Sequence, residues 1–283
     1  MKLAEIVESL PSLKTTVEAH RLMATKALGQ NFLLNQNITD KIIRSSLDKQ
    51  SLADFSGALV FEIGPGPGGL TRAILKANPD KLTVIEMDSR CVTIMEELQA
   101  KTGRVISIEN ADALKYQFQT SGLPTHIISN LPYNISVPLL IKWLYQIDCY
   151  KSLTLMFQKE VADRILAPTN CKDYGRVSVL AQLQCKISRL FDLNPECFVP
   201  APKIWSSVLL FQPQSKTLSS QQIASIEKLT SMAFAQRRKM IRQSLKSLPN
   251  LESACLAAGV ELTARPEEIT PEQFLILADN IKN

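Results

Sequence analysis

The sequence predicts an α/β fold, with an open, doubly wound sheet followed by a small all-helical domain. Short apolar runs alternate with segments of helical periodicity from residue 58 onward, which is typical of parallel strands joined by crossover helices. A polar stretch at 212–222 separates this region from segments that are helical only. With 283 residues, the chain is long enough for one domain of about 200 residues and a smaller one.

Five apolar runs and three helical segments define the expected sheet. The runs are short, as buried parallel strands are, and they read 58-ALVFEI, 82-LTVIE, 104-RVISIEN, 125-THIIS and 153-LTLMF. Helices are expected at 69-GLTRAILKA, 89-SRCVTIMEELQA and 136-SVPLLIKWLYQI. In the last of these, Ser136 has the residue type of an N-cap and Pro138 fits the first turn. Antiparallel strands that close the sheet are expected in 177-VSVLAQLQCKISRLF and 206-SSVLLFQP.

Three regions are expected along the chain. They are a lead at 1–25, a larger domain at 26–213 and a helical domain at 214–283. Helices in the last region are expected at 220–248, 250–258 and 271–282. The segment 263-TARPEEITPEQF twice carries a threonine, proline and glutamate start signal, which supports the last of these helices.

Composition excludes several classes of protein. No apolar run approaches the roughly 18 residues of a membrane span, and the N-terminal segment resembles neither a secretory signal nor a transit peptide, so a cytoplasmic location without membrane contact is expected. Six cysteines occur without a CxxC pair, so neither a disulfide framework nor a metal site is expected. The chain has only His20 and His126, which argues against a histidine-based catalytic pair. A net charge of +5 suits a nucleic-acid binder or an ordinary protein. The oligomeric state is a separate question, for which a monomer is the preferred expectation.

A glycine-rich turn joins the first strand to the first helix. In 60-VFEIGPGPGGLT-71, Gly64, Gly66 and Gly69 satisfy the GxGxxG pattern, and glycines at such a turn let the backbone approach a ligand. A tight strand-to-helix turn needs glycine even without a ligand, so the loop alone is weak evidence. We expect Gly64 and Gly66 to lie against a bound cofactor.

Carboxylates follow the next two strands. Glu86 ends 82-LTVIE about twenty residues after the glycine turn, where a carboxylate accepts hydrogen bonds from both ribose hydroxyls. Asp112 follows the third strand and is placed to receive the amino group of an adenine ring. Asp88 competes with Glu86, but Glu86 directly terminates the apolar run. Because nothing offers a partner for a pyrophosphate or a nicotinamide, S-adenosylmethionine is favoured over a dinucleotide.

The fourth strand runs into 129-SNLPYNIS-136, at the edge of the sheet where ligands of such folds bind. The lone pair of adenine's amino nitrogen is delocalised, so this nitrogen is a poor nucleophile until acceptors hold its hydrogens. The Asn130 side-chain oxygen and the Leu131 carbonyl can supply those acceptors, Pro132 fixes the turn, and Tyr133 can stack on the base. Alignment and electrostatics would then lower the barrier without a strong general base. The alternative is an Asn-Pro turn with a buried tyrosine.

An ordered series of motifs resembles the ribosomal RNA adenine dimethyltransferases of the small subunit (the KsgA/RsmA family). It reads 28-LGQNFLLN, 62-EIGPGPGGLT, 84-VIEMD, 110-NADAL, 129-SNLPYNIS, 174-YGRVSVLAQ, 197-CFVPAPKIWSSV and 234-FAQRRKMIRQSL. The series covers nearly everything from residue 26 to residue 248 and is far more specific than any one member. The resemblance implies a Rossmann-like class I methyltransferase fold. It also implies dimethylation of two adjacent adenines in a small-subunit (16S) rRNA hairpin during ribosome biogenesis.

The same resemblance assigns site residues by position. The residues that it implies in cofactor binding are Gln30, Asn31, Leu33, Gly64, Glu86, Asp112 and Asn130. It also implies that Phe198 forms a second wall facing Tyr133 across the target base, whereas the sequence pattern alone makes Phe198 a core aromatic. Ile204 and Trp205, and the longer lead at 1–25, depart from the usual pattern without touching the inferred chemistry.

A basic run near the C-terminal end indicates an RNA-binding surface. No acidic residue lies between Glu227 and Glu252, and the run holds Arg237, Arg238, Lys239, Arg242 and Lys246. At helical spacing, Arg238, Arg242 and Lys246 share one face while apolar residues point inward. A solvated basic face is the alternative, but phosphate contacts are favoured beside a base-binding pocket, and they supply affinity rather than sequence information.

Together these patterns predict an rRNA adenine dimethyltransferase that uses S-adenosylmethionine and binds the small ribosomal subunit. Two alternatives stay open. One is a relative that acts on large-subunit rRNA, and the other is a non-catalytic RNA-binding assembly or transcription factor on the same fold. Methyl transfer to separated subunits and turnover of the cofactor would distinguish them.

Overall fold

The computed structural model describes residues 2–25, 28–120 and 122–281. Contacts divide the chain into two compact units. One takes residues 1–140, 149–159 and 188–211, and the other takes residues 141–148, 160–187 and 212–283. Because the chain passes between the units several times, no single boundary separates them in the sequence. The expected domain boundary after residue 213 therefore stays a prediction.

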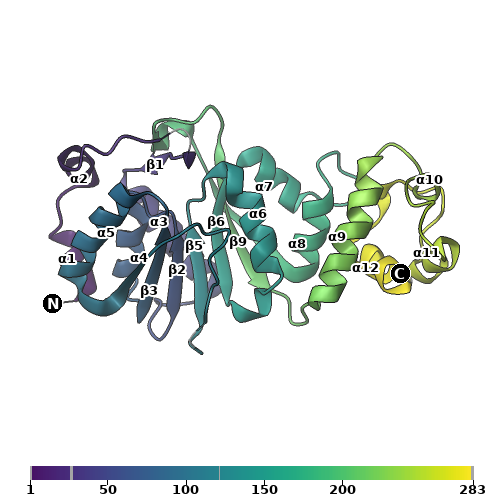
Figure 1. Ribbon diagram of the computed structural model, residues 1–283, viewed down its shortest axis with the longest axis horizontal. Coiled ribbons are helices and arrows are strands. Elements are labelled where there is room, and N and C mark those ends of the chain that lie inside the picture. Colours follow the sequence, from purple (N-terminus) through teal and green to yellow (C-terminus); the bar gives the residue numbers. More distant parts are fainter. Residues whose placement is uncertain (1, 26–27, 121, 282–283) are drawn as a thin grey trace. The chain divides into compact units, whose positions relative to one another are not determined.

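A mostly parallel sheet forms the framework of the first unit. Its strands are β2 (Leu59–Ile63), β3 (Lys81–Glu86), β4 (Ile106–Asn110), β5 (Thr125–Ser129), β6 (Ser152–Gln158), β7 (Cys185–Leu193) and β9 (Ser206–Pro213). Within the described residues the strand order is β4-β3-β2-β5-β6-β9-β7 (Figure 1). Strands β2 to β6 are parallel and β9 is antiparallel to β6. The predicted open, doubly wound α/β fold is confirmed.

The central strands are buried along their whole length. Every residue of β2 and β5 is buried, as expected for parallel strands covered on both faces. The helices that follow β1, β2 and β3 are α3 (Gln36–Gln50), α4 (Gly69–Lys76) and α5 (Ser89–Thr102). The strand order reverses between β2 and β5, and in such sheets ligands bind beyond the carboxyl ends of the strands at this reversal.

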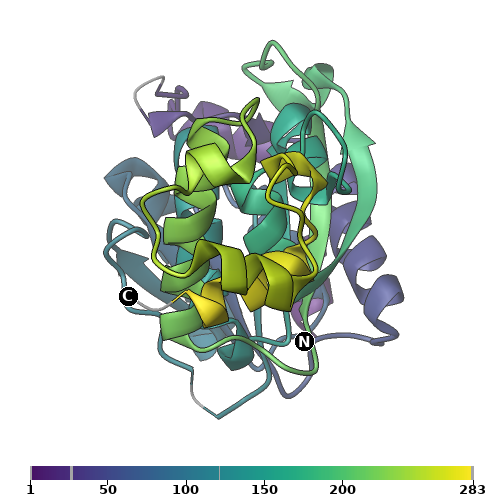
Figure 2. The same cartoon turned by 90° about the vertical axis from the view of Figure 1, so that its right-hand side faces the viewer.

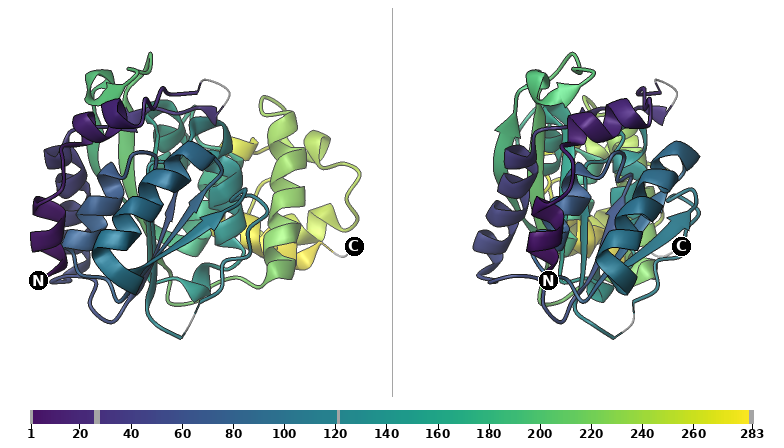
Figure 3. Two further views of the ribbon diagram at one scale, coloured as in Figure 1. Left: turned by 60° about the vertical axis from the view of Figure 1, so that its left-hand side comes forward. Right: turned by 90° about the vertical axis from the view of Figure 1, so that its left-hand side faces the viewer.

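The N-terminal lead is part of the first unit. It forms α1 (Leu3–Glu8) and α2 (Leu13–Ala19), and α1 packs against α4 and α5, as Figure 3 shows in purple and blue. Arg72 of α4 donates hydrogen bonds to the Pro11 carbonyl (2.6 Å) and to the Thr16 hydroxyl (3.2 Å). The described part of the lead, residues 2–25, is therefore tied to the helix that begins at the glycine turn.

A small ribbon pairs two segments that lie far apart in the sequence. Strand β1 (Phe32–Leu33) is antiparallel to β8 (Phe198–Val199), with Leu33 opposite Phe198. Phe32, Leu33 and Phe198 belong to the same buried apolar cluster as the helices and strands of the first unit. The ribbon therefore joins the segment before α3 to the segment before β9.

The second unit is helical. It contains most of α7 (Lys159–Leu166), α8 (Arg176–Gln184), α9 (Ser220–Ala235), α10 (Ile241–Ser244), α11 (Leu251–Ala258) and α12 (Pro271–Asn280), and Figure 2 turns the last four, green to yellow, toward the viewer. Its core includes Tyr174, Ile226 and Phe274, and the Tyr174 hydroxyl donates to the Ile269 carbonyl at 2.9 Å. Thr270 caps α12 and Pro271 is its first residue, which confirms the predicted start signal.

Two of the secondary-structure predictions for this unit are wrong. The stretch 177–184, for which the sequence predicts a strand, lies in α8. The consecutive residues Val179, Leu180 and Ala181 of this helix are buried, and the helix packs against α9 and α12. The single helix expected at 220–248 ends at Ala235. After this break, the backbone N–H groups of Ile241 and Arg242 donate to carbonyls of residues 264 and 262, so they cannot continue the helix.

The helix after β5 also differs from the expectation. α6 (Tyr133–Leu144) begins at Tyr133, so Ser136 is not its N-cap. The Ser136 hydroxyl instead donates to the Tyr133 carbonyl at 2.9 Å, and Pro138 lies inside the helix. Tyr133 is therefore held in the first turn of a helix rather than in a loop.

Candidate active site

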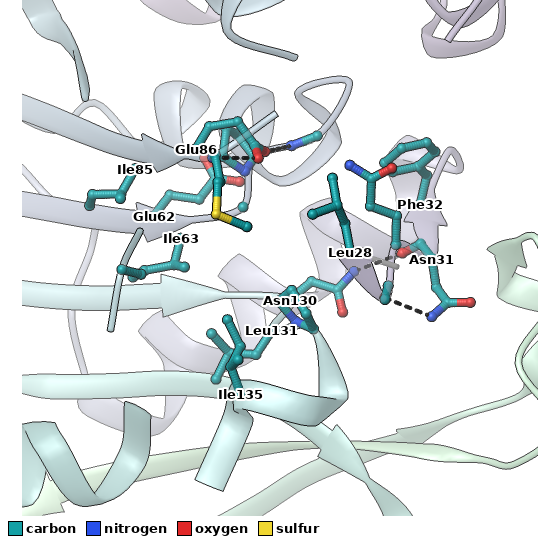
Figure 4. A pocket seen from close by; sticks show the side chains of 18 of the residues that line it. Leu28, Asn31, Phe32, Glu62, Ile63, Ile85, Glu86, Asn130, Leu131 and Ile135 are labelled. Carbon is teal, nitrogen blue, oxygen red and sulfur yellow. Dashed lines mark hydrogen bonds between the residues drawn. The ribbon is translucent and has the colours of Figure 1, made fainter. Parts of the chain in front are cut away.

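A cavity of about 230 Å³ lies at the carboxyl ends of β2, β3 and β5, at the reversal of the strand order (Figure 4). Its lining brings together predicted residues from five segments of the chain: Gln30, Asn31, Leu33, Gly64, Gly66, Glu86, Asp112, Asn130, Leu131, Pro132 and Tyr133. Asp88 and Phe198 lie outside this lining. The cavity therefore contains the residues expected at the cofactor and, except for Phe198, those expected at the target base.

The glycine turn makes room for strand β1. Gly66 has a φ of +54°, and a Cβ atom there would lie 3.0 Å from the Phe32 ring. At Gly69, a Cβ atom would lie 2.5 Å from the Leu33 carbonyl oxygen, which is too close for any side chain. Close packing of the segment 28–33 on the turn therefore accounts for glycine at these two positions, and it builds one wall of the cavity.

Glu86 accepts three backbone hydrogen bonds at the end of β3. Its Oε1 accepts from the N–H groups of Met87 and Asp88 at 2.8 and 2.9 Å, and its Oε2 accepts from Gly66 at 3.3 Å. Burial raises the pKa of Glu86, and these hydrogen bonds oppose the rise. Oε1 already accepts two of these hydrogen bonds and Oε2 one, so of the roughly four lone-pair sites of the carboxylate one on Oε2 remains to accept from a hydroxyl group in the cavity.

Asp88 holds the segment before β1. Its carboxylate accepts from the Arg90 guanidinium at 2.6 and 2.9 Å and from Gln30 Nε2 at 2.9 Å. The Arg90 hydrogen bonds hold the pKa of Asp88 at about 2. Gln30 also accepts from the Thr25 backbone N–H at 2.8 Å. Asp88 is thus occupied by protein groups, whereas Glu86 faces the cavity.

Glu62 is a cavity residue that the sequence reasoning missed. It lies within β2, is 1 % exposed, and its Oε2 has no hydrogen-bond partner among the described residues. Burial raises its pKa to about 8, the charge of Glu86 adds to the rise, and Thr71 opposes it. A signal was available, because a carboxylate inside an apolar strand is almost never fully buried without a partner.

Asn130 is oriented by a backbone carbonyl. Its Nδ2 donates to the Asn31 carbonyl at 3.1 Å, so its Oδ1 is left as a free acceptor among the described residues (Figure 4). Tyr133, three residues on, shares a hydrogen bond of 2.7 Å between its hydroxyl and Ser206 Oγ. Burial raises the pKa of Tyr133, so the phenol is neutral at pH 7. The pair therefore offers an acceptor and a fixed aromatic ring.

Comparison with known proteins identifies the family. The family model described as "Ribosomal RNA adenine dimethylase" matches residues 21–283. The chain belongs to the ribosomal RNA adenine dimethylase family. This dimethylase is similar to proteins named "Ribosomal RNA small subunit methyltransferase A" from Rhodospirillum rubrum and Agrobacterium fabrum, with 44% and 41% identity. Each alignment covers 96% of this chain, and they cover 92% and 98% of the relatives.

Solved structures agree with this family. A dimethyladenosine transferase from Plasmodium falciparum aligns to the dimethylase with a TM-score of 0.71 and 26% identity, over 86% of this chain and 94% of that one. The 23S rRNA methyltransferase ErmE aligns with a TM-score of 0.65 and 23% identity, over 89% and 100% of the two chains, and shows a shared fold. The predicted fold class and enzyme class, a methyltransferase, are confirmed.

The basic run of the dimethylase is partly exposed. Arg238, Lys239, Arg242 and Lys246 are exposed. Arg237 is half-buried, donates to the Cys171 carbonyl at 2.8 Å and pairs with Glu267 at 3.4 Å. Helix α9 ends at Ala235, so the exposed basic residues are spread over the turn after it, the short helix α10 and the residues that follow α10. They do not share one face of a single helix. Arg237 is therefore held by groups of the protein, whereas the other four basic side chains of the run are accessible.

The described parts of the dimethylase contain neither a candidate metal cluster nor a candidate membrane span. In residues 2–25, 28–120 and 122–281, no cluster of three His, Cys, Asp or Glu side chains could hold a metal ion. None of the helices described there is both long and apolar enough to span a membrane.

Proposed function

We propose that this enzyme transfers methyl groups from S-adenosylmethionine to the exocyclic amino groups of two adjacent adenines in a small-subunit rRNA hairpin. Its family makes it an rRNA adenine dimethyltransferase. The observation that carries the more specific proposal is that one cavity is lined by the glycine turn, by Glu86 and Asp112, and by residues 130–133. A methyl donor and a base amino group can therefore meet within it.

The residues present fit an adenosyl sulfonium. Glu86 Oε2 would accept a hydrogen bond from the ribose and Asp112 one from the adenine amino group. Gly64 and Gly66 would lie along the ligand, covered by Asn31 and Leu33. Glu62 and Glu86 are buried with raised pKa values, and a positively charged ligand beside them would lower these values and so favour their ionised forms. When bound, S-adenosylmethionine supplies the methyl group as an electrophile.

Residues 130–133 would orient the nucleophile. Asn130 Oδ1, fixed by the bond from its Nδ2 to Asn31, would accept one hydrogen of the adenine amino group, and the Leu131 carbonyl would accept the other. The Tyr133 ring would stack on the base, and its neutral phenol is tied to Ser206 rather than poised as a base. Positioning would therefore lower the barrier, and the proton would leave after transfer.

Phe198 is the proposed second wall for the target base. Its ring is 2 % exposed and lies in the apolar core, with Leu33 opposite in the β1–β8 ribbon. Contact with a base therefore requires the ring to turn out of the core when RNA binds. Leu33 is itself a cavity residue, and its pairing with Phe198 in the ribbon supports a position for Phe198 next to the cavity.

The proposed partner is the small ribosomal subunit, bound by a monomeric enzyme in the cytoplasm. The exposed residues Arg238, Lys239, Arg242 and Lys246 would contact phosphates and supply affinity that falls steeply with salt. The enzyme would select its target through the shape of the RNA and through the ease with which the target base leaves its stack.

The test is transfer of labelled methyl groups from S-adenosylmethionine to unmethylated small subunits and, in parallel, to large subunits. The products are digested and analysed for dimethyladenosine. Wild type should modify small subunits, Asn130→Ala should lose about 100-fold or more in rate, and Asn37→Ala, at an exposed position on α3, should behave as wild type. Product on large subunits alone would refute the choice of substrate. Binding of cofactor and subunits without any transfer would favour a non-catalytic assembly factor.

A further inference from the structure

We propose that Trp205 stacks on the nucleobase that flanks the target adenine. This inference rests on the proposed function and adds a second base-binding position to it. It concerns a residue outside the cavity described above, on the loop between β8 and β9.

The sheet places Trp205 beside the base-binding residues. In the antiparallel pair of β6 and β9, Ser206 is opposite Gln158, the last residue of β6. Ser206 therefore lies at the carboxyl edge of β6, and the neighbouring strand β5 delivers residues 130–133 at that same edge. The Ser206 hydroxyl contacts the Tyr133 hydroxyl at 2.7 Å. Trp205 directly precedes Ser206, so its Cα atom is about 3.8 Å from that of the residue that holds Tyr133.

The Trp205 backbone is fixed while its ring is accessible. Its carbonyl accepts from the Lys159 backbone N–H at 2.9 Å, which anchors the residue at the start of β9. Its side chain is nevertheless 49 % exposed, whereas Trp143 is 1 % exposed. Tryptophan is usually highly buried, so a half-exposed indole on an anchored backbone needs an explanation.

Nucleic acid is the occupant that best fits this surface. Aromatic stacking accepts any base, and the proposed substrate places a second adenine, with its large π surface, next to the first. Lys203 is also exposed on the same loop, so positive charge for a phosphate accompanies the ring. An apolar protein partner would bury the ring but would gain nothing from Lys203.

Intrinsic fluorescence provides the first test. The probe is an unmethylated RNA hairpin with two adjacent adenines in its loop, added at low salt. Trp143 is buried, so RNA-dependent quenching in wild type should report Trp205. The Trp205→Phe variant keeps Trp143 alone, and its emission should not respond to RNA.

Kinetics on small subunits provide the second test. Trp205→Leu should raise KM for subunits by about 5- to 30-fold, with kcat and the affinity for S-adenosylmethionine unchanged, and Trp205→Phe should restore most of the loss. Absence of quenching by the hairpin would overturn the inference. If KM still rose in that case, the loop would contact a ribosomal protein. Emission that changed with enzyme concentration alone would indicate a second copy and would also overturn it. If wild type methylated no subunit, the proposed function would fail, and quenching alone would decide the role of Trp205.

Discussion

Replacing Glu62 with glutamine should remove one contribution to the pH dependence of stability between about pH 5 and 8, a fall that the buried carboxyl causes in wild type. Burial raises the pKa of Glu62 from 4.5 to about 8. Above pH 4.5 the unfolded chain therefore releases a proton that the folded protein retains. The free energy of unfolding then falls by about 1.4 kcal/mol per pH unit, a total of about 5 kcal/mol at pH 8. Above pH 8 the folded carboxyl ionises as well, and the fall levels off.

Urea unfolding of wild type and Glu62→Gln, followed by circular dichroism at pH 5, 6, 7 and 8, measures this difference. The variant should lose stability less steeply than wild type as pH rises, and it should be the more stable protein at pH 8. Glu96→Gln, which changes an exposed carboxylate on α5, is the control and should follow wild type. Parallel curves for wild type and Glu62→Gln would mean that Glu62 is already ionised in the fold, and the argument for its protonation would be wrong.

Three further predictions concern the walls of the cavity and the basic surface. Asp88→Asn weakens the hydrogen bonds from Arg90 and Gln30 that fix the segment before β1, so the dissociation constant for S-adenosylmethionine, measured by calorimetry, should rise by about tenfold. An unchanged constant would show that other contacts fix this segment. Gly69→Ala forces a Cβ atom to within 2.5 Å of the Leu33 carbonyl and should cost about 1–3 kcal/mol of stability, whereas Gly175→Ala, with open space around it, should not. Changing Arg238, Arg242 and Lys246 together to alanine should make the negative slope of log affinity against log salt shallower by about 2 to 3, and an unchanged slope would mean that other residues contact the phosphates.

Elements with a strong local signal could be predicted from the sequence. The buried runs at β2, β3 and β5 and the proline start of α12 need no distant partner to be recognised. The identity of α8 could not be predicted, because its alternating residues suit a strand and only packing against α9 and α12 selects a helix. The end of α9 depends on hydrogen bonds from residues 241 and 242 to the segment 262–264, which no local pattern contains.

The candidate site also contains some residues that could be predicted from the sequence and others that could not. Residues at the ends of strands, such as Glu86 and Asn130, could be placed at the cavity because topology brings the carboxyl ends of parallel strands together. The reason that Asp88 lies outside the lining, its bonds to Arg90 and Gln30, involves a side chain 58 residues away. Glu62 could not be placed at the cavity because it lies inside a strand that is otherwise apolar, and the apolar pattern predicts burial in the core rather than a position at a ligand.

The ribbon of β1 and β8 has an evolutionary consequence. Leu33 lies on the wall of the cofactor cavity, and the residue opposite it in the ribbon is Phe198, the proposed wall for the base. Both side chains are buried in one apolar cluster, so a change of volume at either position is felt by the other. With the proposed roles of Leu33 and Phe198, selection on the donor side and on the acceptor side of the reaction would be coupled through this pair. Across the family, positions 33 and 198 should vary together even where the RNA targets differ.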